Sequence, residues 1–161
     1  MYTDQKRTVK TYIIAILIPL SIGALAAFLT RNSMQIYQTL KTPPLAPPAW
    51  LFPVVWTALY VLMGISSALI RSARRDDRRA ADTGLAYYAI SLGFNFAWSL
   101  IFFNQRWILL AFFWLLALLY LVIRTVIAYR RVVPLAAYLQ IPYVLWLGFA
   151  GYLNLGILLL N

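Results

Sequence analysis

Five long apolar stretches alternate with short polar segments along the chain. They cover about residues 11–30, 50–70, 84–103, 107–129 and 134–160. Each is long enough to cross a hydrocarbon layer of ~30 Å, which takes about 20 helical residues. Because the membrane core offers no water to backbone polar groups, each stretch is predicted to be a helix. The pattern predicts an all-α membrane protein, a five-transmembrane-helix bundle that forms one domain over residues 1–161.

Prolines occur at positions that affect the predicted helices and the long connection. Pro19 and Pro142 lie inside the first and fifth stretches, where each is predicted to kink the helix or free a carbonyl. The long connection at residues 31–49 is expected to be a stiff, lid-like loop. Its prolines are Pro43, Pro44, Pro47 and Pro48. The first stretch has no clear cleavage site after it, so we expect a permanent helix rather than a signal peptide.

Charge changes the picture by giving the bundle an orientation. The chain is 63% hydrophobic and carries a net charge of +10, with its basic residues in the gaps between apolar stretches. One side of the membrane would hold eleven of the 14 Lys and Arg side chains, and the other side three. This asymmetry predicts an inside N-terminus and an outside C-terminus, and it suits a bacterial cell membrane. The three on the other side are Arg31, Lys41 and Arg106.

The densest basic run, "RSARRDDRRAAD" at residues 71–82, admits two interpretations. It could bind anionic lipid or a partner, or it could be a solvated loop that fixes topology. We favour the solvated loop, because its own aspartates dilute the positive charge. Nucleic-acid binding is not expected, since a binding patch must be contiguous in water.

The residue types needed for most catalysis are missing. The chain has no His and no Cys, and its acidic side chains are only four aspartates, none deep in an apolar stretch. The sequence therefore lacks the residues that zinc or haem ligation requires, and it also lacks those of paired-carboxylate and nucleophile–histidine mechanisms. We predict no catalytic residue, no metal site and no obligatory cofactor. The aspartates are Asp4, Asp76, Asp77 and Asp82.

Aromatic residues are the remaining candidates for chemistry. Trp56, Trp98 and Trp146 lie well inside the second, third and fifth stretches, deeper than an interfacial belt requires. Helical spacing places Asn95 with Trp98, and Asn154 with Trp146, on shared faces. One interpretation is interhelical packing, with buried amides donating across an interface. The other is a ring-lined cavity suited to a flat hydrophobic ligand.

The third stretch also carries Ala89, Gly93 and Ala97 at intervals of four. Such a small-residue stripe lets two helices approach closely. It predicts either internal packing or a homodimer interface.

Three motifs resemble the translocator protein family, also called the tryptophan-rich sensory protein or peripheral-type benzodiazepine receptor family. They are Y-x5-P-x3-PP-x7-W-x3-Y (Tyr37 to Tyr60), "FNFAWSLIFF" (94–103) and "PYVLWLGFAGYLN" (142–154). The resemblance implies a five-helix bundle, often homodimeric, that binds porphyrins such as protoporphyrin IX and other planar hydrophobic ligands. The matching ligand-contacting residues are Tyr37, Pro47, Trp56, Asn95, Trp98, Ser99, Trp146 and Ala150.

This chain departs from the family pattern in its loop and at its end. Ile36 and Leu45 stand where the family commonly has tryptophan, which should weaken porphyrin stacking or photochemistry. The last helix lacks the basic residue of the animal cholesterol motif, so cholesterol binding is not expected. A similar pattern at Leu118, Tyr120 and Arg124 is taken as coincidental.

The leading hypothesis is a membrane receptor or sensor for porphyrin-like ligands, linked to stress response or tetrapyrrole homeostasis. Transport of porphyrins or other hydrophobic molecules is an alternative. Light-dependent porphyrin degradation is a further one, and it would have to rest on tryptophan chemistry.

Overall fold

The structure, a computed structural model, describes the backbone of residues 2–33 and 39–161 and the side chains of residues 8–33 and 39–161. Within these ranges there is no strand, and five spans are long and apolar enough to cross a membrane. The all-α membrane bundle is confirmed. Its elements are α1 (Tyr2–Thr30), α2 (Leu51–Ser72), α3 (Arg78–Ser99), the π-helical turn η2 (Leu100–Asn104), α4 (Ile108–Val132), α5 (Pro134–Tyr138) and α6 (Ile141–Leu160).

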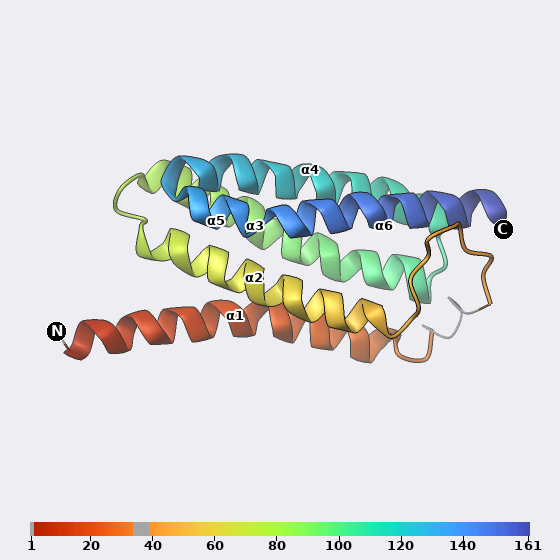
Figure 1. Ribbon diagram of the computed structural model, residues 1–161, viewed down its shortest axis with the longest axis horizontal. Helices are drawn as coiled ribbons and strands as arrows, with labels where there is room; N and C mark the ends of the chain where they lie inside the picture. The colour runs from red at the N-terminus through yellow and green to blue at the C-terminus, as the bar shows by residue number, and fades with distance from the viewer. Residues whose placement is uncertain (1, 34–38) are drawn as a thin grey trace.

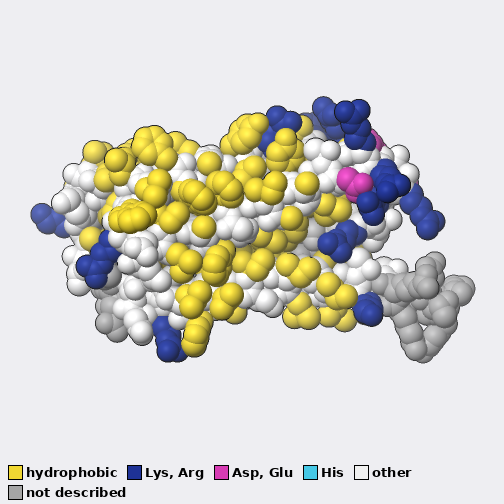
Figure 2. Space-filling model, turned by 180° about the vertical axis from the view of Figure 1, so that it is seen from behind, with side chains coloured by type: hydrophobic (Ala, Val, Ile, Leu, Met, Phe, Trp, Pro, Cys, Tyr) yellow, Lys and Arg dark blue, Asp and Glu magenta, His cyan; other side chains and the backbone are white. Residues whose placement is uncertain are grey.

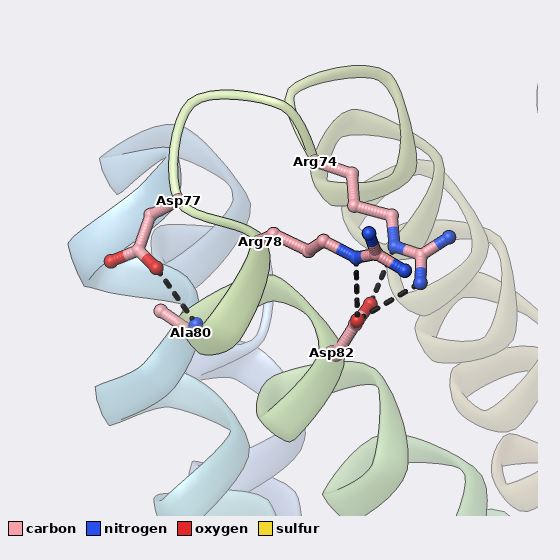
Figure 3. A network of polar contacts seen from close by, with 5 residues as sticks. All are labelled: Arg74, Asp77, Arg78, Ala80 and Asp82. Carbon is pink, nitrogen blue, oxygen red and sulfur yellow. Dashed lines mark hydrogen bonds and ion pairs between the residues drawn. The ribbon is translucent and has the colours of Figure 1, made fainter.

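Two helices begin earlier than predicted. The first begins at Tyr2 rather than near residue 11, because apolarity marks the membrane-crossing part and the helix continues beyond it into polar residues. The third begins at Arg78 rather than near residue 84. Asp77 caps it, since its carboxylate accepts a hydrogen bond from the Ala80 backbone N–H at 2.9 Å (Figure 3). An aspartate in this position is a common helix start, and the apolar pattern alone missed it.

The fifth stretch is two helices, α5 and α6, with a turn at residues 139–140. Pro142 causes the break that was predicted there, because its ring excludes a continuous helix and it has no N–H to donate. Ser66 of α2 stabilises this turn through hydrogen bonds. The Gln140 amide donates to the Ser66 hydroxyl at 3.2 Å, and that hydroxyl donates to the Ala136 carbonyl at 2.7 Å. In α1, by contrast, the helix continues through Pro19.

The helices run back and forth along the long axis of the molecule (Figure 1). α1 packs along α2, while α3 and α6 pack on α4. Gly64 allows a close approach of α1 to α2, since a Cβ added there would lie 2.5 Å from the Ile16 Cα. Similarly, a Cβ on Gly84 of α3 would lie 2.7 Å from the Tyr129 ring of α4.

The two ends of the bundle differ. We call the end with the α2–α3 connection the basic end, and the end with residues 39–50 the loop end (Figure 1). Figure 2 shows Lys and Arg side chains gathered at both ends of one face, with hydrophobic side chains between them. At the basic end, Arg74 forms a bidentate ion pair with Asp82 at 2.5 and 2.9 Å, and Arg78 lies 3.7 Å from the same carboxylate (Figure 3). This layout is the one expected for a bundle that spans a membrane.

Candidate functional site

A cavity of about 450 Å³ lies in the loop-end half of the bundle. Four parts of the chain enclose it: the second half of α1, the start of α2, the end of α3 with η2, and the middle of α6. Its aromatic lining residues are Phe52, Trp56, Tyr60, Trp98, Phe103 and Trp146. The volume falls within the range of roughly 300–1,000 Å³ typical of small-molecule sites.

The rings support one another across the helices. Trp56 stacks on Tyr60 with centroids 5.5 Å apart, and its edge meets Trp146 at 6.5 Å. Phe52 meets the same Trp146 ring at 6.0 Å. On the opposite wall Trp98 stacks on Phe102 at 5.2 Å. Such stacked and edge-to-face pairs add stability beyond area burial, so the rings are held in place without a ligand.

The wall contributed by α1 is made of small residues. Gly23, Ala24 and Ala27 line the cavity, and a Cβ on Gly23 would collide with the Tyr60 ring. Larger side chains at these positions would fill the cavity or displace α2. Sequence reasoning missed this wall, although the segment "GALAAF" at residues 23–28 held the signal in its small residues at helical spacing.

No charged side chain lines the cavity among the described residues, and its hydroxyl donors are already used. Thr30 donates to the Ala26 carbonyl at 2.9 Å, and Thr57 donates to the Pro53 carbonyl at 2.8 Å. The Ser99 hydroxyl lies 3.5 Å from the Asn95 carbonyl.

Two indole N–H groups of the lining tryptophans are buried in the wall rather than exposed to the cavity. The Trp98 and Trp146 nitrogens are buried without a hydrogen-bond partner in the described structure. Leaving such a group unpaired costs about 1–3 kcal/mol.

Asn95 is buried behind this wall and does not line the cavity. Its amide donates to the Tyr143 hydroxyl at 2.8 Å and its oxygen accepts from the Tyr60 hydroxyl at 3.4 Å. Asn154 likewise donates to the Ile108 carbonyl of α4 at 3.0 Å. Both interpretations of the pattern therefore apply to different residues: the amides join helices, and the tryptophans line a cavity.

The predicted ligand-binding residues divide into three groups. Trp56, Trp98, Ser99, Trp146 and Ala150 line the cavity together. Asn95 and Pro47 are not among its lining residues, and Tyr37 lies outside the described residues.

The described part of the long loop packs on α6. Pro43 is buried against Gly156, where an added Cβ would lie 2.5 Å from the Pro43 ring. The Tyr152 hydroxyl donates to the Pro44 carbonyl at 2.7 Å. Asn161 exchanges two hydrogen bonds with the Lys41 backbone, each 3.0 Å long. Residues 39–50 thus lie at the cavity end of the bundle without lining the cavity.

Of the two loop positions at which this chain lacks a tryptophan of the family pattern, the structure describes one. Ile36 lies outside the described residues. Leu45 is 84% exposed and has a φ of 69°, a left-handed conformation that a leucine rarely adopts.

The π-helical turn η2 could not be foreseen from the sequence. Its wider turn is closed by the Gln105 N–H, which bonds to the Leu100 carbonyl at 3.1 Å. One inserted residue rotates the following side chains by about 100° around the helix axis. Phe103 then faces the cavity, while Phe102 is buried against α4 and α6.

The small-residue stripe of α3 is not an internal packing surface. Ala89 and Gly93 are exposed, and a Cβ built on Gly93 would meet no described atom within 4 Å beyond its chain neighbours and its own helix backbone. Ala97 is half-buried. The homodimer interpretation of the stripe stays a prediction.

Comparison with known proteins agrees with this architecture. The model of the TspO/MBR family matches residues 15–160. The tryptophan-rich protein TspO of Chlorobaculum tepidum is 33% identical over 98% of this chain and 99% of its own length. The protein of the same name from Archaeoglobus fulgidus is 36% identical over 91% and 94%, and the translocator protein of Bos taurus is 37% identical over 86% and 82%. With its five apolar spans, this is an integral, multi-pass membrane protein. The chain belongs to the TspO/MBR family.

Proposed function

We propose that this protein is a membrane-embedded receptor for planar hydrophobic ligands of the porphyrin type, linked to stress response or tetrapyrrole homeostasis. The observation that carries the proposal is the cavity of about 450 Å³ walled by six aromatic rings from α2, α3, η2 and α6. Flat conjugated molecules stack on such rings, and their transfer from water is favoured by the apolar lining.

The polar groups of the wall narrow the ligand chemistry. With its hydroxyl protons used internally and no charged lining residue among those described, the cavity offers little to a small ionic ligand.

The test is a titration of protoporphyrin IX into the purified full chain, followed by porphyrin absorbance. The double variant Trp56→Ala/Trp146→Ala removes two cavity rings and is expected to lower affinity at least about tenfold. Trp50→Ala/Trp107→Ala is the matched control, because those side chains are 66% and 58% exposed and do not line the cavity. Equal affinity of both doubles for the porphyrin would overturn the assignment.

Transport is the second candidate, favoured by the name translocator protein that the Bos taurus relative carries. The same cavity would then hold the ligand in transit. Porphyrin uptake into liposomes with and without the protein distinguishes the two, since a receptor binds the ligand without increasing its entry rate.

A further inference from the structure

A second hollow, of about 360 Å³, lies between α3 and α4 at the basic end of the bundle. It is separate from the aromatic cavity, with which it shares no lining residue. Its polar and basic lining consists of Asp77, Arg79, Thr83, Tyr87, Arg124 and Arg131. Three arginines, a threonine and a tyrosine therefore line one concave site, and guanidinium and hydroxyl groups are donors that suit a phosphate group.

The charge of this hollow is not neutralised by the protein. Arg79, Arg124 and Arg131 form no ion pair with any described residue. Asp82 pairs with Arg74 and Arg78, Asp77 caps α3 (Figure 3), and Asp76 is exposed and does not line the hollow. Even with the Asp77 carboxylate counted, the lining keeps an excess of two positive charges.

Arg124 is held in position by both helices. Its guanidinium carbon lies 5.3 Å from the centre of the Tyr87 ring of α3 and 5.9 Å from that of Tyr120 of α4. Its Nη1 also donates to the Tyr120 hydroxyl at 3.3 Å. Cation–π contacts of this kind orient a guanidinium while leaving its remaining N–H groups available.

The depth of Arg124 points to a lipid rather than a soluble anion. It precedes the end of α4 at Val132 by eight residues, which corresponds to about 12 Å along the helix. Ile127 lines the hollow and is itself 48% exposed, and Ile123 beside Arg124 is 40% exposed. The hollow thus places a basic site next to an apolar helix surface. This arrangement suits a lipid, whose headgroup is charged and whose acyl chains are apolar.

We propose that this hollow binds the phosphate of an anionic phospholipid from the leaflet at the basic end, with its acyl chains along the exposed faces of α3 and α4. Basic pockets between membrane helices are recognised sites for anionic headgroups. The basic run at residues 71–82 contributes only Arg79 and Asp77 among the named lining residues. The arginines of α4 supply the rest of the charge.

The experiment measures phospholipid binding to the full chain in detergent by native mass spectrometry, with phosphatidylglycerol and phosphatidylcholine of matched acyl chains. The variant Arg124→Gln/Arg131→Gln removes two charges from the hollow. Arg75→Gln/Arg130→Gln removes two exposed charges at the same end that do not line it. We expect the first double to lower phosphatidylglycerol affinity about tenfold, the second less than about twofold, and phosphatidylcholine to bind equally weakly to all three proteins.

Three results would overturn the proposal. If both doubles lost phosphatidylglycerol affinity equally, the attraction would be diffuse rather than specific to the hollow. If phosphatidylcholine bound as tightly as phosphatidylglycerol, charge would play no role. If millimolar inorganic phosphate displaced the lipid, the hollow would be a site for soluble anions. Where the first double does not fold, Arg124→Lys takes its place. It keeps the charge but loses the planar fork, so phosphatidylglycerol affinity should fall about threefold, and an unchanged affinity would equally count against the site.

Discussion

The amide of Asn95 joins two buried phenols, and its removal gives the sharpest test of how the cavity wall is built. Tyr143 is 1% exposed and does not line the cavity, so its hydroxyl has no water to turn to when the amide is lost, whereas Tyr60 is 7% exposed and lines the cavity. The substitution Asn95→Ala leaves both hydroxyls without this partner. Tyr143→Phe, by contrast, leaves the contact between Asn95 and Tyr60 in place.

The geometry sets the size of the effect. Only the Asn95–Tyr143 bond, at 2.8 Å, is short, and the Tyr60 contact at 3.4 Å is weak. A buried group left unpaired costs about 1–3 kcal/mol, and side-chain hydrogen bonds in membrane bundles average about 0.6 kcal/mol. We therefore expect Asn95→Ala to lower the free energy of unfolding by about 2 kcal/mol and Tyr143→Phe by about 1 kcal/mol. Since both remove the same bond, the double variant should lose about 2 rather than about 3 kcal/mol.

The measurement is reversible unfolding of the purified chain in mixed micelles, with sodium dodecyl sulfate as denaturant and helicity followed by circular dichroism. Asn95→Ala combined with Asn154→Ala serves as the control, because Asn154 bonds to the Ile108 carbonyl and should add independently. Additive losses for Asn95→Ala and Tyr143→Phe would refute the reasoning. So would a variant of Asn95 that keeps full stability and loses porphyrin affinity, since that result would place the amide against the ligand.

The remaining predictions concern helix packing, the proposed dimer interface and backbone strain. Gly64→Ala should lower the free energy of unfolding by about 1–3 kcal/mol in the same titration, because the new methyl would meet the Ile16 backbone at 2.5 Å. Gly148→Ala, where the new methyl would meet no described atom within 4 Å beyond its chain neighbours and its own helix backbone, should be neutral or slightly stabilising. Gly93→Leu should convert a dimer to a monomer in light scattering if the α3 stripe is the interface, and Gly148→Leu should leave the mass unchanged. Leu45→Asn should raise stability by up to about 1 kcal/mol, since asparagine tolerates the φ of 69° better than leucine; a loss of stability would show that the leucine makes a contact worth more than the strain.

The existence of each membrane helix was predictable because apolarity over a membrane's thickness leaves the backbone no alternative to a helix. The ends of the helices were not predictable from apolarity, because they depend on local polar contacts. Asp77 starts α3 six residues before the apolar pattern begins, and α1 extends through polar residues that carry no periodic signal. The break before Pro142 was predictable, since it follows from the covalent structure of proline alone.

The sequence predicted which tryptophans line the cavity, but it did not predict that Asn95 lies behind the cavity wall. Spacing placed Trp56, Trp98 and Trp146 on inward faces, and all three line the cavity. The same spacing placed Asn95 with them, because the angular position on a helix does not say whether a side chain meets a cavity or a neighbouring side chain. The rotation of Phe103 by η2 depends on one inserted residue in the helix, for which the sequence has no marker.

The attachment of the long loop to α6 decides which parts of the molecule move together. Lys41, Pro43 and Pro44 are joined to the last helix by three hydrogen bonds and a glycine contact, so this segment behaves as an extension of α6. By contrast, one hydrogen bond among the described residues joins α1 to η2, from the Asn104 amide to the Leu29 carbonyl at 3.2 Å. For the ligand proposed above, we therefore expect entry between α1 and η2, where fewer contacts have to break than between α1 and α2, while residues 41–44 stay packed on α6.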